Sequence, residues 1–317
     1  MYVPWYGPIY WPYAYHDIFY YTFWPYAYDP GYWFYAYDDF FDGIFFPYGA
    51  PYIQYAYGGP YEGPYVRETT GRAPSQVPPG RLTADTRQFC EQQAEGITAW
   101  PFEQIEQAVR PTSSQKVLLE NLKKAADEAA AQFRSACPEV VPMTPPGRLQ
   151  AMSTRLQATL DAVKTVRPPL TAFYASLSNE QKASFNETGP ELAEQRQRTA
   201  RGATPTPPDC SSEKAGLSNL AVERIEEAVR TTVAQYAALE RLDAAMQKAV
   251  DTLREACPTT APATPVGRLE VMQQRLEAMI KAADAVRPAL EGFYATLNDE
   301  QKAKFNRLGR ATARSGG

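Results

Sequence analysis

Largely apolar residues recur at intervals of seven along two long stretches of the chain, residues 145–177 and 265–297. A heptad pattern of this kind favours long helices that pack against each other at a shallow angle, as in hairpins and bundles. It therefore predicts one long helix in each stretch. The positions in the first are Leu149, Met152, Leu156, Thr159, Val163, Val166, Leu170, Phe173 and Leu177. Those in the second are Leu269, Met272, Leu276, Met279, Ala283, Val286, Leu290, Phe293 and Leu297.

Threonine and proline mark where these helices begin and bend. Thr144–Pro145 and Thr264–Pro265 predict helix starts, with threonine as the N-cap and proline at the first helical position. Pro168 and Pro288 lie inside the heptads. They predict kinks and not helix ends, because the apolar pattern continues beyond them.

An apolar pattern with steps of three and four residues precedes the first heptad stretch, from about Trp100 to Ala136. Pro111 interrupts it, since proline removes a backbone donor and disfavours helix at Arg110. A kink or break is expected there. The corresponding residues of the second half, 230–233, contain no proline, so a straighter helix is expected in that half.

The two halves are copies of each other. Residues 90–186 align without a gap to residues 210–306 at a constant offset of 120, and nearly half of the aligned positions are identical. The predicted fold is all-α, with two tandem copies of a kinked antiparallel hairpin of long helices after an aromatic N-terminal region. The expected boundaries are a low-complexity region at 1–66, a linker at 67–89, the first repeat at 90–188, a linker at 189–209, the second repeat at 210–309 and a tail at 310–317.

Residues 1–66 are rich in tyrosine, tryptophan and phenylalanine and contain six acidic residues but no lysine or arginine. Near-repeats such as Trp11-Pro-Tyr-Ala-Tyr15 and Trp24-Pro-Tyr-Ala-Tyr28 occur in this region. Aromatic rings stack on flat apolar surfaces and are stable at membrane interfaces. One interpretation is a contact region for glycan, membrane or protein. The other is a low-complexity segment with no dedicated partner.

Four cysteines, Cys90, Cys137, Cys210 and Cys257, form two pairs that share an internal spacing of 47 residues. Three pairings are possible. A duplicated unit most simply keeps its own bridge, which favours Cys90–Cys137 and Cys210–Cys257 and an oxidising compartment. Four buried free thiols are the alternative. The pairing also requires the segment 96–110 to fold back along the longer helix, because a straight helix from about Trp100 to Ala136 would span roughly 50 Å, far beyond disulfide reach.

Each heptad stretch ends in a helix corner. Ser178 and Asn298 are good N-caps, and Gln181 and Gln301 sit three residues later, where a capping box places glutamine. The apolar residue before each cap is placed to pack on the new helix. The corner residues of interest are Leu177, Ser178, Glu180 and Gln181 in the first copy and Leu297, Asn298, Glu300 and Gln301 in the second.

These corners resemble the LTXXQ motif of the bacterial envelope family that includes the Spy and CpxP chaperones. Ser178 and Asn298 stand where that family usually has threonine. The resemblance extends to the Val-Arg-Pro, Phe-Tyr-Ala and Gln-Lys-Ala-x-Phe-Asn sequences around each corner and covers about residues 90 to 309. It implies a periplasmic, ATP-independent chaperone or stress-response protein that binds unfolded or envelope proteins on helical surfaces.

The same resemblance implies a concave surface that is partly apolar and partly basic. Six arginines near the heptad positions recur in both copies, and we assign them to a candidate client surface, with ordinary flanking charge as the alternative. They are Arg148, Arg155, Arg167, Arg268, Arg275 and Arg287. The competing hypothesis is a non-catalytic envelope scaffold anchored through residues 1–66. A metal-responsive envelope protein is a third option, because some relatives sense metals. Met152, Met272 and Met279 lie on heptad positions, however, where core packing explains them.

Composition limits the remaining function classes. The net charge is −4, and residues beyond 66 have a net charge of +2. This balance does not indicate a nucleic-acid-binding protein. The single histidine, His16, lies in the aromatic region, so catalytic constellations that need an imidazole are not expected in the helices. No phosphate loop or metal-ligand motif occurs. We expect neither an enzyme, nor a cofactor, nor a metal site.

Localisation is inferred from the cysteines and the resemblance. We expect an exported protein of the periplasm or cell envelope. No signal peptide is visible, so it has either been removed or lies upstream of Met1. No apolar run is long enough for a transmembrane helix.

Overall fold

The computed structural model describes residues 100–137, 144–186, 220–256 and 264–306. Within these ranges the chain forms helices and no strand, so the all-α prediction is confirmed. The first repeat contains α6 (Phe102–Val109), α7 (Ser113–Ser135), α8 (Pro145–Ser176) and α9 (Asn179–Asn186). The second contains α11 (Leu220–Val229), α12 (Val233–Glu255), α13 (Pro265–Thr296) and α14 (Asp299–Asn306). The aromatic region, both predicted linkers and the predicted tail lie outside the described residues.

Both heptad helices begin and continue as their sequence predicts. The Thr144 hydroxyl caps α8 by accepting from the backbone N–H of Gly147, and Thr264 caps α13 in the same way. The helix then runs without interruption through Pro168 in α8 and through Pro288 in α13.

The helix before each heptad helix is broken at the same place in both repeats. Arg110 has φ 49° and Arg230 has φ 54°, so each ends its short helix in the left-handed region. A new helix then starts one turn later with Thr112 or Thr232 as N-cap. The expectation of a straighter second copy is therefore wrong. The second copy divides its helix without a proline: Arg230 takes a positive φ, and the Gln235 side-chain oxygen accepts from the backbone N–H of Thr232 at 3.0 Å.

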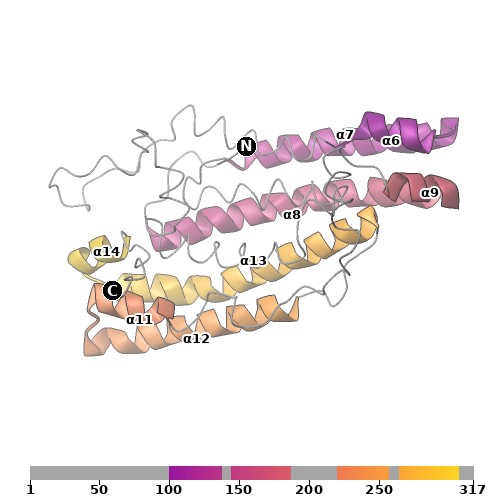
Figure 1. The fold of residues 1–317 in the computed structure, drawn as a ribbon. Coiled ribbons are helices and arrows are strands. Elements are labelled where there is room, and N and C mark those ends of the chain that lie inside the picture. Colours follow the sequence, from indigo (N-terminus) through magenta and orange to yellow (C-terminus); the bar gives the residue numbers. More distant parts are fainter. Residues whose placement is uncertain (1–99, 138–143, 187–219, 257–263, 307–317) are drawn as a thin grey trace, which may run out of the picture.

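The chain reverses at the break in the first repeat. The ammonium of Lys116 in α7 lies 3.1 Å from the carboxylate of Glu106 in α6, so the short helix folds back beside the start of the long one. The short helix α6 also packs against α9, and α11 packs against α14. These two pairs lie at opposite ends of the molecule (Figure 1).

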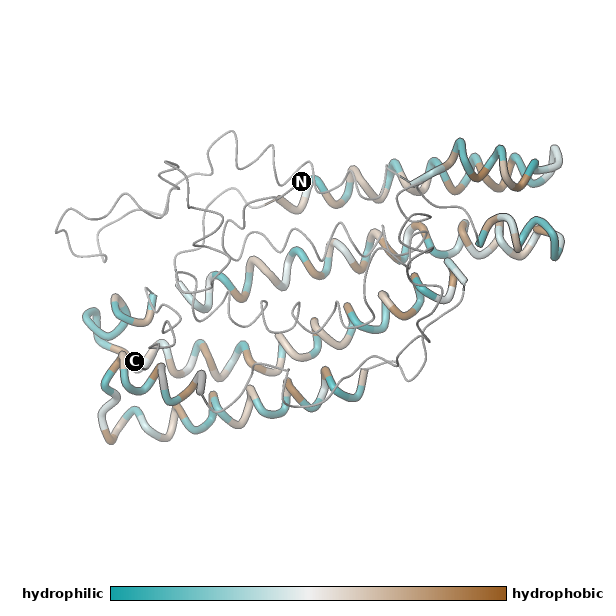
Figure 2. Tube along the Cα trace, viewed as in Figure 1, coloured by the Kyte–Doolittle hydropathy of each residue, from teal (hydrophilic) through white to brown (hydrophobic). Residues whose placement is uncertain are grey.

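The four long helices lie side by side in the order α7, α8, α13, α12 (Figure 1). Hydrophobic positions recur along each of them between hydrophilic ones (Figure 2). Every heptad position named above is buried, at 4% exposure or less. Because α8 packs against α7 on one side and α13 on the other, it also buries Leu160 and Ala162, which lie outside the two heptad columns.

The two repeats contact each other through α8 and α13, which run antiparallel. Arg167, late in α8, reaches Glu270, early in α13, and Arg287, late in α13, reaches Gln150, early in α8. Because the repeats are offset by 120 residues, Glu270 is the equivalent of position 150 and Arg287 is the equivalent of position 167. The two contacts are therefore equivalent, as across a twofold interface in which residue i meets j and j meets i.

Candidate functional site: glutamine corners and an inter-repeat groove

The motif corner between α8 and α9 is a complete capping box. The Ser178 hydroxyl accepts from the backbone N–H of Gln181 at 3.2 Å, and the Gln181 side-chain oxygen accepts from the backbone N–H of Ser178 at 2.9 Å. Leu177, just before the cap, is buried. The predicted capping box is confirmed. The pKa of the exposed Glu180 carboxyl is held below its usual range, first by its own backbone N–H and then by the Ser178 hydroxyl.

Gln181 also makes contacts that its capping role does not require. Its side-chain amide forms a reciprocal pair with that of Gln115 in α7, with one N–H···O bond of 2.9 Å and one of 3.0 Å. Gln181 donates its second N–H to the carbonyl of Val109, which ends α6. Gln115 donates to the carbonyl of Ser176, which ends α8, at 2.7 Å.

Gln115 is itself the capping-box residue of α7, because its side-chain oxygen accepts from the backbone N–H of Thr112 at 2.9 Å. Two capping boxes are thus joined through their glutamines, and the pair also satisfies the last carbonyls of two other helices. Four helix ends meet at one amide pair. This arrangement accounts for the glutamine of the motif, since free backbone groups at buried helix ends are costly.

The second repeat repeats this corner. Gln301 and Gln235 pair with two bonds of 2.9 Å, Gln235 donates to the carbonyl of Thr296, and Gln301 donates to that of Arg230. The Asn298 side chain caps α14 in place of a hydroxyl, accepting from Gln301 N–H at 2.9 Å. The ammonium of Lys304 donates to the carboxylate of Glu300 at 2.8 Å, and this contact lowers the pKa of the Glu300 carboxyl.

Gln115 and Gln235 are site residues that the sequence analysis did not identify. Their signal was present, because Thr112 and Thr232 precede them by three residues, the spacing of a capping box. What the sequence could not supply was the partner. The two glutamines of each pair are 66 residues apart, and only the hairpin brings them together.

Aromatic residues on both sides of each corner pack together. The rings of Phe173 and Phe185 pack edge-on, with their centroids 5.9 Å apart. The centroid of the Tyr174 ring lies 5.5 Å from that of Phe185. Asn186 donates to the Tyr174 hydroxyl at 3.2 Å, and the Lys182 ammonium lies over the Tyr174 ring. The second repeat has the same cluster at positions 120 residues later. The sequence context around the motif therefore fixes the short helix against the long one.

The prediction of an exposed basic client surface is wrong for four of the six arginines. Arg148, Arg155, Arg268 and Arg275 are buried at 5% exposure or less. Each of them lies immediately beside a heptad position in the sequence. The sequence suggested solvated charge there because arginine is seldom buried unless it is paired.

Two of these arginines satisfy carbonyls at helix C-termini. Arg155 donates to the carbonyl of Phe133 in the last turn of α7 at 2.8 Å, and its guanidinium lies 3.8 Å from the centre of the Phe133 ring. Arg148 donates at 3.4 Å to the carbonyl of Asn306, which ends α14 in the other repeat. A cation is favourable at a helix C-terminus because the last carbonyls carry partial negative charge. Arg268 and Arg275 occupy the equivalent positions of the second repeat.

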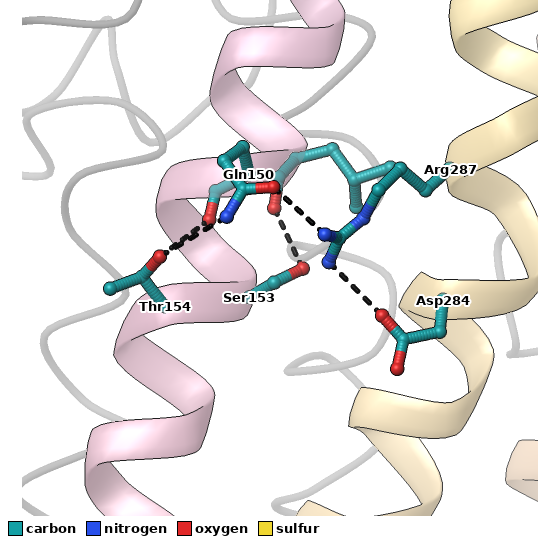
Figure 3. Close-up of polar contacts among 6 residues, drawn as sticks. Gln150, Ser153, Thr154, Asp284 and Arg287 are labelled. Carbon is teal, nitrogen blue, oxygen red and sulfur yellow. Dashed lines mark hydrogen bonds and ion pairs between the residues drawn. The ribbon is translucent and has the colours of Figure 1, made fainter.

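The remaining two arginines, Arg167 and Arg287, are partly exposed and join the repeats. Arg167 donates to Gln273 at 2.7 Å and lies 3.6 Å from the carboxylate of Glu270. Arg287 donates to Gln150 at 2.8 Å and to Asp284 on its own helix at 3.0 Å (Figure 3). They are interface residues.

A groove with a volume of about 540 Å³ lies where α7, α8 and α13 meet. Figure 3 shows its centre, where Arg287 of α13 reaches across to Gln150 of α8 beside Ser153 and Thr154. Ser153 donates its hydroxyl back to the carbonyl of Leu149, which keeps this short side chain against its own helix. The lining comes from Gln132, Ser135 and Ala136 of the α7 end, from Gln150, Ser153, Thr154, Gln157, Ala158 and Asp161 of α8, and from Ile280, Asp284 and Arg287 of α13.

Met152, Met272 and Met279 are buried in the core, as expected for heptad positions. Across the described ranges, no group of three or more histidine, cysteine, aspartate or glutamate side chains is placed to hold a metal ion. In the same ranges, no helix combines the length and apolar character needed to cross a membrane.

Of the four cysteines, only Cys137 falls within the described residues. It is disulfide-bonded, and its sulfur lies 3.8 Å from a guanidinium nitrogen of Arg155. Cys90, Cys210 and Cys257 lie outside the described residues. The pairing of Cys90 with Cys137 and of Cys210 with Cys257 therefore stays a prediction.

The family comparison agrees with the repeat structure. The model of the LTXXQ motif family matches residues 97–189 and again residues 218–309, which together make up more than half of the chain. Searches of curated proteins and of solved structures gave no match. The family comprises helical proteins of the periplasm that are related to envelope stress. With both corners and both repeats matched, this chain belongs to the LTXXQ motif family.

Proposed function

We propose that this protein is an ATP-independent, non-enzymatic chaperone of the periplasm that binds unfolded or envelope proteins on its helical surfaces. The observation that carries the proposal is the duplicated family unit, packed as four long helices side by side. Such a layer offers much helix surface for its size. The buried glutamines and arginines serve the fold, which leaves the outer faces of the helices for binding.

Exposed apolar side chains on the outer helices support this proposal. Val233 and Tyr236 in the first turn of α12 are 96% and 49% exposed, and Val117 in α7 is 60% exposed. Residues three apart on a helix share one face, so Val233 and Tyr236 form a single apolar spot. In the first repeat the equivalent positions are Ser113 and Lys116. The spot therefore belongs to the second repeat and not to the shared architecture.

Light scattering of an aggregating client tests the proposal. A reduced, unfolding protein is mixed with this chain at equal molar amounts without nucleotide, and suppressed scattering is expected. The double variant Val233→Ser and Tyr236→Lys, which introduces the residues of the first repeat, should suppress less well. Both positions are exposed, so the variant should fold normally. Unchanged scattering with the wild-type chain would contradict the proposal.

A second candidate function rests on the aromatic composition of residues 1–66. It is a non-catalytic scaffold in which this region contacts glycan or membrane and holds the helices at the envelope. Cells that express the protein with and without residues 1–66 are fractionated. Loss of envelope association in the shortened form supports the scaffold, and identical behaviour of both forms removes its basis.

A further inference from the structure

The twofold relation between the repeats gives the groove an internal counterpart. At the opposite end of the α8–α13 contact, Glu270, Gln273 and Glu277 stand where the groove has Gln150, Ser153 and Gln157. There the long side chains hold the helices together. Arg167 binds Glu270 and Gln273, and Lys164 lies 3.5 Å from Glu277. The groove end lacks these carboxylates and has a serine where the counterpart has a glutamine.

The groove therefore differs from its counterpart in side-chain size and in charge. Its volume lies within the roughly 300–1,000 Å³ that is usual for ligand sites. Ser153 is the smallest of the exchanged side chains, and its hydroxyl is directed back to its own helix. Asp161 and Asp284 replace Lys281 and Lys164 of the counterpart, so the groove has two carboxylates and one guanidinium.

The polar groups of the groove match those of a polypeptide main chain. The amides of Gln132, Gln150 and Gln157 each donate one N–H to a neighbouring side chain, and each has a second N–H that can donate to a main-chain carbonyl. The hydroxyls of Ser135 and Thr154 donate to backbone carbonyls of their own helices and can still accept. The apolar lining is aliphatic and comes from Ala136, Ala158 and Ile280. A groove for sugars would be expected to offer an aromatic ring for stacking, and no ring is among the lining residues.

We propose that this groove binds an extended stretch of unfolded polypeptide and prefers stretches with basic side chains. The inference rests on the proposed chaperone function and gives it a site and a client class. Main-chain carbonyls accept from the second N–H groups of the glutamine amides, and small side chains lie against the alanines. Lysine or arginine lies near Asp161, because Asp284 is already paired with Arg287. The twofold-related end of the interface, closed by ion pairs, is not part of the site.

Peptide binding to the full chain tests the proposal. The probe is a fluorescent, capped peptide of alanine, glycine and serine with lysine at every third position, and its twin has glutamate in place of lysine. Fluorescence anisotropy should show tighter binding of the lysine peptide. Ser153→Gln, which introduces the counterpart residue, should weaken binding by about tenfold or more. Gln273→Ser, the matched change at the other end, should leave it unchanged.

Position 153 is buried, so Ser153→Gln could lose binding by misfolding. A second variant at an exposed position keeps the test decisive in that case. Asp161 is exposed, and Asp161→Lys introduces the counterpart residue 281. It should reduce or reverse the preference for the lysine peptide. Equal binding of both peptides by wild type, or unchanged binding by both variants, overturns the proposal. Displacement of the peptide by a soluble chitotetraose at lower concentration than by unlabelled peptide would assign the groove to glycan instead.

The outcomes separate this inference from the proposed function. If the chain suppresses client aggregation equally well with Ser153→Gln, and the peptide does not bind, the groove proposal fails while the chaperone proposal stands. If the peptide binds in the groove but aggregation is not suppressed, the chaperone proposal fails and a peptide site remains.

Discussion

The corners of the two repeats share the same glutamine pair, whereas the two ends of the contact between α8 and α13 use different side chains. At the corners, each glutamine pair satisfies backbone groups from four helix ends. Losing either glutamine would leave buried groups without partners. At the α8–α13 contact the side chains are partly exposed, and water can replace a lost partner. The comparison indicates that the two repeats share the side chains that satisfy buried backbone groups. They differ in side chains that are partly exposed, where water can take the place of a lost partner.

Removing a corner glutamine should have the largest effect. Gln181→Leu leaves the Gln115 amide, the Ser178 N–H and the Val109 carbonyl without their partner, and should cost about 2–4 kcal/mol of unfolding free energy. Gln301→Leu in the second repeat should cost a similar amount. Urea unfolding followed by circular dichroism measures both. A much smaller cost in one repeat would show that the corners are not equivalent.

The amide pair can be tested separately by a double-mutant cycle. Gln115→Leu combined with Gln181→Leu should cost less than the sum of the two single changes, because each single change orphans the other amide. Additive costs would mean that the two glutamines act only as independent caps.

Replacing a buried arginine should cost a different amount of unfolding free energy in each repeat. Arg155 lies over the Phe133 ring, whereas the position equivalent to Phe133 in the second repeat is Leu253. Arg155→Met should therefore cost more than Arg275→Met, by about 0.5–2 kcal/mol for the ring contact. In a Phe133→Leu background this difference should disappear. If it persists in urea unfolding, the ring does not account for it.

The α8–α13 contact should respond more weakly. Gln150→Glu gives Arg287 the carboxylate that Arg167 already has in Glu270, and should stabilise the chain by about 0.2–1 kcal/mol at low salt. Glu270→Gln should have the opposite sign. Both effects should shrink in high salt because the pairs are partly exposed. Urea unfolding at two salt concentrations provides the measurement. A gain that salt does not reduce would rule out charge pairing as its cause.

The sequence was sufficient for features that depend on local spacing. The heptads identified the buried positions of α8 and α13, and Thr144, Ser178 and Asn298 identified helix starts. It was insufficient where two distant segments decide the outcome. The burial of Arg148 depends on α14 of the other repeat, 158 residues away. The groove depends on the packing of α8 against α13, which neither heptad implied, since each hairpin could have buried its apolar face alone.

The smallest expected effect concerns Tyr294, whose hydroxyl donates to the Asn306 side chain at 3.0 Å. Burial raises the pKa of Tyr294 above its ordinary value, while the Arg148 cation lowers it in part. Folding then favours the neutral phenol. The associated stability is complete below the unfolded pKa of about 10 and is lost as pH rises through the higher folded value.

Urea unfolding at several pH values around and above about pH 10 should therefore show a steeper loss of stability for the wild type than for Tyr294→Phe. Tyr174→Phe is the matched control for losing the equivalent hydroxyl at neutral pH. Because Arg148 belongs to the first repeat and Tyr294 to the second, Arg148→Gln should raise the pKa of Tyr294 further and steepen the loss. An alkaline slope that does not change in Arg148→Gln would mean that the charge at the start of α8 does not act across the contact between repeats.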